Sequence, residues 1–200
     1  MISIFDYGAG NLRSVENTLA AIGAQYELVR DSQALRRASK IILPGVGHFG
    51  QMMRALDQLD VRTALLERIR AGVPFLGICL GLQALFTSSA EAPEECGLGL
   101  FEGEVRRFEG DARIPHMGWN QLDRRRDSRL LHDAGEKPYV YFAHSYYVPV
   151  VPQASATCDY TLPYTAVLEH ENVSGVQFHP EKSGAMGLRI VRNFVEEWPK

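Results

Sequence analysis

Cysteine is scarce in this chain of 200 residues, which contains only Cys79, Cys96 and Cys158. Three scattered cysteines are too few for a disulfide framework, and an odd number is typical of proteins from reducing compartments. The sequence has no Cys-x-x-Cys and no His-x-x-x-His spacing, so it predicts no metal site. We therefore expect a cytoplasmic protein without structural metals or disulfides.

Net charge is also small, because 24 acidic residues nearly balance 21 basic ones and leave a formal charge of -3. This balance gives no reason to expect a nucleic-acid partner. The one basic cluster is Arg124–Arg126. Nucleic-acid binders spread basic charge over a whole face, so a solvated turn is the simpler interpretation of this run.

No segment has the composition of a targeting signal, since Met1–Asp6 lacks a basic region and meets an acid almost at once. Residues 71–90 contain no charged side chain and could span a bilayer on length alone. Pro74, Gly77, Gly81 and the polar end of this run argue against a span. A buried strand followed by a half-buried helix explains it better, and we expect no membrane contact.

The first half of the chain alternates between strand-like and helix-like patterns. The expected strands are Met1–Phe5, Gln25–Val29, Lys40–Leu43 and Val73–Ile78. The expected helices are Asn11–Ile22, Ser32–Ala38, Phe49–Arg70 with a break near Asp60, and Leu80–Phe86. This alternation is typical of a parallel sheet with helices on both faces.

The second half is richer in strands and turns, with strands expected at Gly99–Phe108, Pro138–Tyr147, Tyr164–Glu169 and Val173–Phe178. A last helix, from near Ser183 or Gly187, places a broad apolar stripe on one face: Met186, Ile190, Val191, Phe194, Val195 and Trp198. No repeat, linker or low-complexity tract appears. We predict one α/β domain over 1–200, an open, mostly parallel sheet with an antiparallel portion in the later half.

Cys79 lies between Gly77 and Gly81, where a strand pattern gives way to a helix pattern. This is typical of a sharp strand-to-helix turn that exposes a nucleophile at the end of a sheet strand. The same turn aims the backbone N–H of Leu80 at a developing oxyanion. A buried structural cysteine is an equally common interpretation of such a motif by itself. Cys96 and Cys158 have no such surroundings, and we assign them to structure.

His179 follows the strand pattern Val173–Phe178 and is stopped from continuing it by Pro180. Glu181, two residues on, can return to the same side and fix the imidazole tautomer. Cys79, His179 and Glu181 together form a nucleophile, a base and an orienting carboxylate. A structural histidine is the alternative for His179 alone.

Two glycine-rich turns follow other strands. Pro44–Gly47 is either an ordinary tight turn or an oxyanion-hole and substrate loop, in which Gly45, Val46 and Gly47 approach the ligand. Gly8–Asn11 lacks the full dinucleotide-binding pattern, so a phosphate site is a weak alternative there.

Two motifs, Gly77–Gln83 and Phe178–Glu181, resemble the signatures of class I (triad-type) glutamine amidotransferases. Within that family the chain is similar to the glutaminase subunits of imidazole glycerol phosphate synthases. The matching segments, in family order, are Tyr7–Ser14, Pro44–Phe49, Pro115–Asn120, Tyr141–Tyr147 and Gln177–Ser183. The first and third separate this group from the anthranilate, carbamoyl phosphate and pyridoxal phosphate amidotransferases. No catalytic position departs from the pattern.

The resemblance implies that Cys79 attacks the side-chain amide of glutamine, that His179 shuttles the proton and that Glu181 orients His179. It implies an oxyanion hole from Leu80 and from Gly47 or Val46. Glutamine contacts are expected from Gln83, Ser145 and Tyr146, and no metal or organic cofactor is expected.

The resemblance also implies a partner, a (β/α)8-barrel cyclase subunit that receives the ammonia in histidine biosynthesis. Since free ammonia would be lost to water, we hypothesise that Pro44–Gly47 is a switch that silences hydrolysis until the partner is loaded. We expect the docking face near Asn11, Trp119, Tyr141 and Lys182.

Two alternatives remain at this stage. One is another enzyme, either an amidotransferase serving a different synthase or a cysteine hydrolase of the α/β-hydrolase type, in which the acid usually precedes the histidine. The other is a docking subunit without activity, which an intact Cys79, His179 and Glu181 disfavours.

Overall fold

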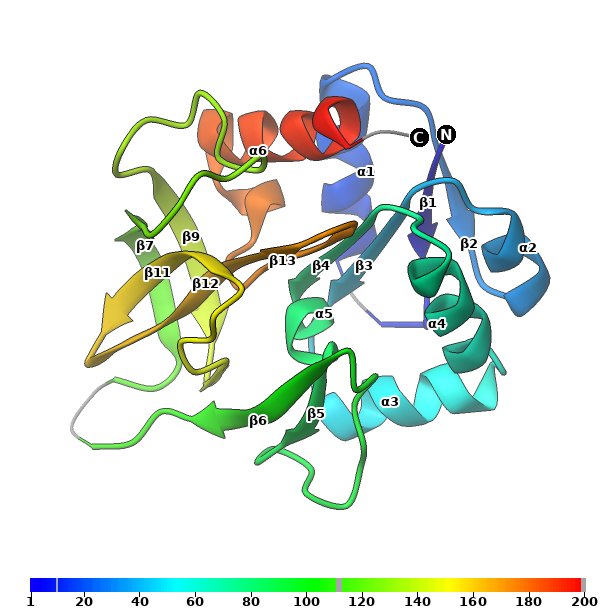
Figure 1. Ribbon diagram of the computed structural model, residues 1–200, viewed down its shortest axis with the longest axis horizontal. Coiled ribbons are helices and arrows are strands. Elements are labelled where there is room, and N and C mark those ends of the chain that lie inside the picture. Colours follow the sequence, from blue (N-terminus) through cyan, green and yellow to red (C-terminus); the bar gives the residue numbers. More distant parts are fainter. Residues whose placement is uncertain (10, 111–112, 199–200) are drawn as a thin grey trace.

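The computed structural model describes residues 1–9, 11–110 and 113–198 and consists of a twisted central sheet flanked by helices (Figure 1). In the first half the strands are β1 (Ile2–Phe5), β2 (Tyr26–Val29), β3 (Ile41–Gly45), β4 (Phe75–Cys79) and β5 (Phe86–Ser89). The helices there are α1 (Leu12–Ala21), α2 (Ser32–Arg37), α3 (Phe49–Gln58), α4 (Arg62–Arg70) and the single turn α5 (Leu80–Gln83).

The second half consists mainly of strands. These are β6 (Phe101–Arg107), β7 (His116–Gln121), β8 (Asp123–Arg124), β9 (Tyr139–His144), β10 (Tyr146–Tyr147), β11 (Ala154–Tyr160), β12 (Leu162–His170) and β13 (Val173–Val176). The 3-10 turn η1 (Pro180–Lys182) and the helix α6 (Gly184–Glu197) complete it.

The central sheet has the order β2-β1-β3-β4-β13-β12-β11-β8. Its first five strands are parallel, and β12, β11 and β8 continue it in antiparallel fashion. The predicted fold class, a mostly parallel sheet with an antiparallel later portion, is therefore confirmed. Two smaller sheets, β10-β6-β5 and β7-β9, lie beside it. The prediction that 1–200 forms one domain stays a prediction.

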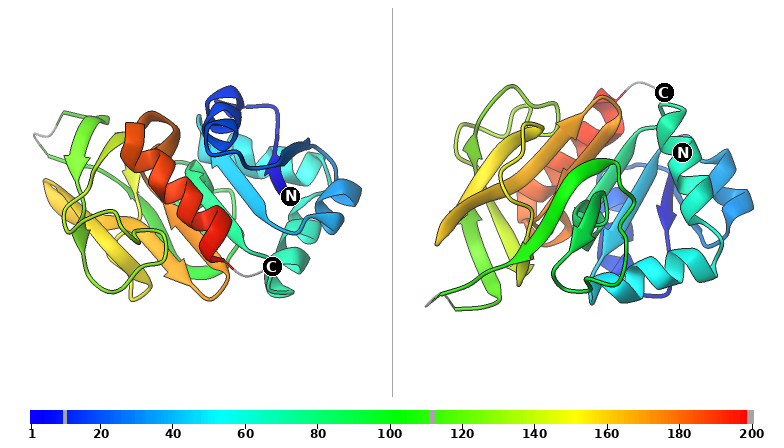
Figure 2. Two further views of the ribbon diagram at one scale, coloured as in Figure 1. Left: turned by 90° about the horizontal axis from the view of Figure 1, so that it is seen from above. Right: turned by 60° about the horizontal axis from the view of Figure 1, so that its bottom comes forward.

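Alternate side chains of the strands bury into two separate apolar layers, as expected for a sheet covered on both faces. On β3, Ile41 and Leu43 pack with α3 and α4, whereas Ile42 packs on the opposite face with α1 and α6. Figure 2 shows α1 and α6 together on one side of the sheet and α3 and α4 on the other. Among the described residues no helix is long and apolar enough to cross a membrane.

The expected break near Asp60 is confirmed, because α3 ends at Gln58, α4 begins at Arg62 and Asp60 has φ 51°. The expected helix Leu80–Phe86 is wrong in its second half. It ends at Gln83, and the Leu85 carbonyl instead accepts the N–H groups of Leu100 and Phe101 at 2.9 and 3.1 Å. That pairing starts β5, which the sequence did not predict.

Candidate active site

Three parallel strands end at the same edge of the sheet, which brings the predicted motifs together. Gly45 at the end of β3 pairs with Cys79 at the end of β4, and Val176 at the end of β13 pairs with Ile78. His179 follows β13 by three residues. This carboxyl edge is where open α/β sheets bind ligands.

Cys79 has φ 55° and ψ −107°, a strained conformation for a residue with a side chain and typical of a nucleophile held at a sharp turn. The flanking glycines permit it sterically. A Cβ on Gly77 would lie 2.4 Å from the Gly81 carbonyl oxygen, and one on Gly81 would lie 2.0 Å from that of Leu43. The glycines therefore let α5 fold back against β3 and β4.

His179 and Glu181 form a buried pair, with Nδ1 2.8 Å from Oε1 and both side chains 3% exposed. A carboxylate only accepts, so His179 Nδ1 carries the proton and Nε2 is left for the thiol. The main chain is held by Tyr141, whose carbonyl accepts the His179 N–H at 2.9 Å, and by Ser183, whose Oγ donates to the His179 carbonyl at 2.7 Å. The other oxygen of Glu181, Oε2, is buried and has no hydrogen-bond partner among the described residues.

The electrostatics of this pair favour a charged imidazole. Burial lowers the pKa of His179, but the negative charge of Cys79, hydrogen bonds to Cys79 and Glu181 and the charge of Glu181 outweigh it and raise the pKa to about 10. The His179 imidazole therefore stays protonated near neutral pH, next to the sulfur of Cys79. That arrangement can provide a nucleophile and a proton donor at the same time.

A cavity of about 260 Å³ opens onto Cys79 and His179. Six of the seven predicted glutamine contacts line it: Val46, Gly47, Leu80, Gln83, Ser145 and Tyr146. The seventh, Gly45, lies beneath the turn instead, where a Cβ would come within 2.7 Å of the Leu80 Cβ. Glu91 also lines the cavity and was missed, because nothing in the sequence around it marks a site.

Gln83 presents a defined polarity to this cavity. Its Nε2 donates to the Tyr146 carbonyl at 2.8 Å and to Gln177 Oε1 at 3.1 Å. Both hydrogens of the amide nitrogen are thereby used, so Gln83 offers its oxygen to a ligand. A substrate group that donates hydrogen bonds suits this position.

The Pro44–Gly47 turn is held by a hydroxyl from another strand end. Tyr7, just after β1, donates its O–H to the Val46 carbonyl at 3.0 Å and accepts the Val46 N–H at 3.2 Å. Burial is the main cause that raises the pKa of Tyr7 to about 12, so the hydroxyl stays neutral. Gly47, with φ 96°, has the freedom to let the neighbouring peptide rotate. The weaker alternative, a phosphate site at Gly8–Asn11, includes Gly10, which lies outside the described residues.

Three of the four expected docking residues, Trp119, Tyr141 and Lys182, lie close together. They form a surface over β7 and β9 that we call the exposed ridge. Trp119 on β7 is 56% exposed and packs edge-on against Tyr141 of β9 at 6.2 Å between centroids. Lys182 in η1 holds its Nζ 5.8 Å from the Tyr141 ring. The fourth, Asn11, is exposed at the start of α1, which packs against η1.

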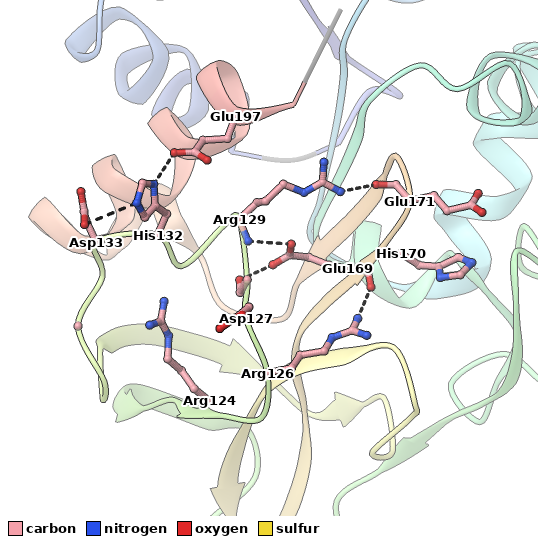
Figure 3. Close-up of a pocket in the computed structure, with 12 residues that line it drawn as sticks. Arg124, Arg126, Asp127, Arg129, His132, Asp133, Glu169, His170, Glu171 and Glu197 are labelled. Carbon is pink, nitrogen blue, oxygen red and sulfur yellow. Dashed lines mark hydrogen bonds and ion pairs between the residues drawn. The ribbon is translucent and has the colours of Figure 1, made fainter.

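A larger cavity, about 720 Å³, is not the candidate site. It lies at the turn between β12 and β13, the opposite end of β13 from His179 (Figure 3). Arg124 and Arg126 of the predicted solvated turn are exposed there, and both donate to backbone carbonyls. Five carboxylates and three arginines line it, a balance that disfavours an anionic ligand. Among the described residues no cluster of metal-ligating side chains occurs.

Comparison with known proteins defines the class. The sequence profile of the family described as "Glutamine amidotransferase class-I" matches residues 3–198, and the chain belongs to that family. Within it, the Methanothermobacter thermautotrophicus protein named imidazole glycerol phosphate synthase subunit HisH is 50% identical over 197 residues, 98% of each chain. The Deinococcus radiodurans protein of the same name is 44% identical over 98% of this chain and 93% of its own.

Solved structures support the fold independently. The structure titled "Structure of PurLQS from Thermotoga maritima" superposes with a TM-score of 0.78 at 20% identity, over 99% of this chain and 98% of that one. Another, titled "Crystal structure of glutamine amidotransferase", gives 0.75 at 18% identity over 98% and 97% of the two chains. At these identities the likeness establishes the fold alone.

Proposed function

We propose that this chain is the glutaminase subunit of imidazole glycerol phosphate synthase, and that it supplies ammonia to a cyclase subunit in histidine biosynthesis. The observation that carries the proposal is Cys79 at its positive-φ turn, facing the buried pair of His179 and Glu181 inside a glutamine-sized cavity. Near-full-length identity of 50% to a HisH protein supports the choice of synthase. Three unpaired cysteines suit the cytoplasm.

The proposed first half-reaction uses Cys79 as a thiolate nucleophile and the imidazolium of His179 as the proton donor. Cys79 Sγ attacks the amide carbon of glutamine, and the carbonyl oxygen becomes an oxyanion held by the N–H of Leu80 and one from Val46 or Gly47. His179 Nε2 then gives its proton to the amide nitrogen. The carbon–nitrogen bond breaks, ammonia leaves and a glutamyl thioester remains on Cys79.

The second half-reaction returns the enzyme to its starting state. The now neutral His179 takes a proton from water, and the resulting hydroxide attacks the thioester carbon. The carbon–sulfur bond breaks, glutamate leaves and the thiolate is restored beside the imidazolium. Glu181 keeps the Nδ1–H tautomer throughout, so that Nε2 always faces the reaction.

Turnover by the chain together with the cyclase subunit and its nucleotide tests this function. Glutamate release that depends on the chain, with ammonia incorporated into the imidazole product, is expected. Hydrolysis of simple esters by the isolated chain in place of glutamine would indicate the hydrolase alternative. Production of neither glutamate nor imidazole would contradict the proposal.

Substrate recognition assigns a role to Glu91. Among the described residues that line the cavity, it is the one acidic side chain, and the N–H of Phe49 holds its Oε2 at 2.7 Å. The α-ammonium group of glutamine needs such a partner. Glu91→Gln is expected to raise the KM for glutamine about 10- to 100-fold with little change in kcat, since a charge-assisted bond is lost.

Steady-state kinetics at varied glutamine concentrations measure this effect. Glu94→Gln, which changes an exposed acid three residues away, provides the matched control and keeps the wild-type KM. A fall in kcat for Glu91→Gln without a change in KM would contradict the assignment.

The cyclase subunit is proposed to dock on the exposed ridge of β7 and β9. Trp119 and Met117 are 56% and 65% exposed, and Met117 also lines the mouth of the cavity. A partner seated on this apolar ridge would cover the exit through which ammonia leaves. Large aromatic side chains commonly dominate interface energetics.

Trp119→Ala is expected to weaken binding of the cyclase about 10- to 100-fold. Titration calorimetry measures it. Leu59→Ala removes an apolar side chain of 40% exposure from the α3–α4 turn and leaves the affinity unchanged. Equal affinities for wild type and Trp119→Ala would place the interface elsewhere.

The switch hypothesis for Pro44–Gly47 assigns a specific role to Tyr7. While the Val46 N–H donates to the Tyr7 hydroxyl, it is not available to an oxyanion. Tyr7→Phe is therefore expected to raise glutamine hydrolysis by the isolated chain about tenfold. Without the hydroxyl, the Pro44–Gly47 turn more readily adopts the conformation in which the Val46 N–H is free to bind the oxyanion. The stimulation by loaded cyclase shrinks by the same factor.

Glutamate release with and without the cyclase and its nucleotide measures both quantities. Tyr26→Phe, on the half-buried strand β2, serves as the matched hydroxyl deletion and retains the wild-type ratio. A lower rate for the isolated Tyr7→Phe chain would contradict this role, because it would show that the hydroxyl stabilises the active conformation of the Pro44–Gly47 turn. Equal rates of wild type with and without partner would refute the switch itself.

A further inference from the structure

Gln177 is a fully buried amide that the reaction described above does not use. It lies between β13 and His179, and its Nε2 is 3.6 Å from Cys79 Sγ, within hydrogen-bonding distance for a sulfur acceptor. Its Oε1 accepts the Gln83 Nε2–H at 3.1 Å. Gln177 therefore connects a proposed glutamine contact with the reacting sulfur.

The direction of this chain of hydrogen bonds is fixed by a backbone carbonyl. The oxygen of Tyr146 only accepts, so the group of Gln83 that lies 2.8 Å away must be its NH2. The other hydrogen of that NH2 faces Gln177, whose side-chain oxygen must accept it. Reversal of the Gln177 amide would place two NH2 groups against each other, so its NH2 points at the sulfur.

His144 contacts the same Tyr146 carbonyl and supports the same direction of the hydrogen bonds. Its Nδ1 lies 2.8 Å from the Tyr146 carbonyl and its Nε2 lies 3.3 Å from the Tyr164 hydroxyl. Burial is the main cause that lowers the pKa of His144 to about 3, so the ring is neutral. Nδ1 then donates to the Tyr146 carbonyl, and Nε2 accepts from the Tyr164 hydroxyl. His144 therefore helps to fix the carbonyl that orients the amides of Gln83 and Gln177.

We propose that Gln177 is a catalytic residue of the glutaminase reaction, because its amide N–H donates to Cys79 Sγ and stabilises the thiolate. This deepens the proposed function and rests on it. The thiolate is present twice in the cycle, before it attacks the amide and when it leaves the thioester, and a donor in a water-poor site favours both states. The donor transfers no proton, so the balance of the reaction is unchanged.

Other titratable groups lie around the thiol and stay in place when Gln177 is changed. They come from five strands: Tyr7 follows β1, Glu91 follows β5, His144 ends β9, Tyr164 lies on β12, and His179 and Glu181 follow β13. Because Gln177 is neutral, its removal alters the thiolate through a hydrogen bond and not through a change of net charge.

The test measures the alkylation of each cysteine by iodoacetamide as a function of pH, mapped by peptide mass spectrometry. Gln177→Met keeps a similar volume and removes the donor. It is expected to move the acidic limb of the Cys79 alkylation profile to higher pH, so that the alkylation rate on that limb falls about tenfold. The rate at the alkaline plateau stays the same. Cys96, an exposed thiol, is the internal reference in every sample.

Two further variants keep the test decisive. Ser174→Ala deletes another buried hydrogen bond on β13, from Ser174 Oγ to the Phe75 carbonyl, and should leave the Cys79 profile unchanged. Gln177→Asn, which retains an amide that is too short to bridge Gln83 and sulfur, should shift the profile in the same direction as Gln177→Met if the latter does not fold. A folded variant with the wild-type profile would overturn the proposal. Failure of the wild type to hydrolyse glutamine would instead refute the function and leave this comparison valid.

Discussion

Cys79→Ala abolishes glutamine-dependent synthesis of imidazole glycerol phosphate and leaves synthesis from added ammonium intact. The expected loss is roughly 10⁴-fold or more, since without a nucleophile only positioning and oxyanion stabilisation remain. Ammonium reaches the cyclase without the thiol, so its use reports that the subunits still fold and assemble. Both rates are measured with the purified cyclase and its nucleotide.

The chain offers a matched control for this result. Cys96→Ala removes an exposed thiol from outside the cavity and is expected to retain both activities. Loss of ammonium-dependent synthesis in Cys79→Ala would indicate a misfolded or wrongly assigned subunit. Retention of glutamine-dependent synthesis would refute Cys79 as the nucleophile.

Glu181→Gln is expected to lower glutamine hydrolysis roughly 10³-fold, within the range for loss of an orienting carboxylate. An amide in this position can donate as well as accept, so it no longer selects the His179 tautomer with a proton on Nδ1. The fold is expected to persist, because the replacement has the same shape in a site where both side chains are buried.

The pH dependence gives this variant a second readout. Burial opposes the charge of His179, and Cys79 together with Glu181 raises its pKa to about 10. A group with a raised pKa loses its proton as the pH rises through that value, so the imidazolium persists well above neutral pH in the wild type. Without the charge of Glu181 the pKa falls, and the alkaline limb of the residual rate moves to lower pH.

Glu196→Gln on α6 changes an exposed carboxylate of 59% exposure and should affect neither rate nor profile. A residual Glu181→Gln activity with an unshifted alkaline limb would show that Glu181 does not influence the protonation of His179. A rate within a few-fold of wild type would remove it from the triad.

The sharp turn at Cys79 and the pair of His179 and Glu181 could be predicted because their sequence patterns are local. Gly77 and Gly81 flank the cysteine in the sequence, and His179 and Glu181 are two residues apart at a strand end. Parallel strands then place both motifs on one edge of the sheet. Local signals also predicted β1, β3 and β4 of the central sheet, because these strands are mainly apolar runs.

The remaining features depend on contacts between distant residues. Tyr7 meets Val46, and Gln177 meets Cys79, across 39 and 98 positions. No local pattern predicts such pairs. Strand β11 escaped prediction because its buried residues are small: Ala154, Ala156 and Cys158 alternate with Ser155 and Thr157, which gives a weak hydrophobic signal although most of the strand is buried. Glu91 resembles any surface acid until the fold places it at the cavity.

The central claim is that glutamine is cleaved through a covalent bond to Cys79, and the most direct test is to trap that bond. The chain, bound to its loaded cyclase, is mixed with isotope-labelled glutamine, quenched in acid during turnover, digested and analysed by mass spectrometry. The account predicts a labelled glutamyl group on the peptide that carries Cys79. A label on Cys96 or Cys158, or rapid turnover with no labelled cysteine at all, would contradict it.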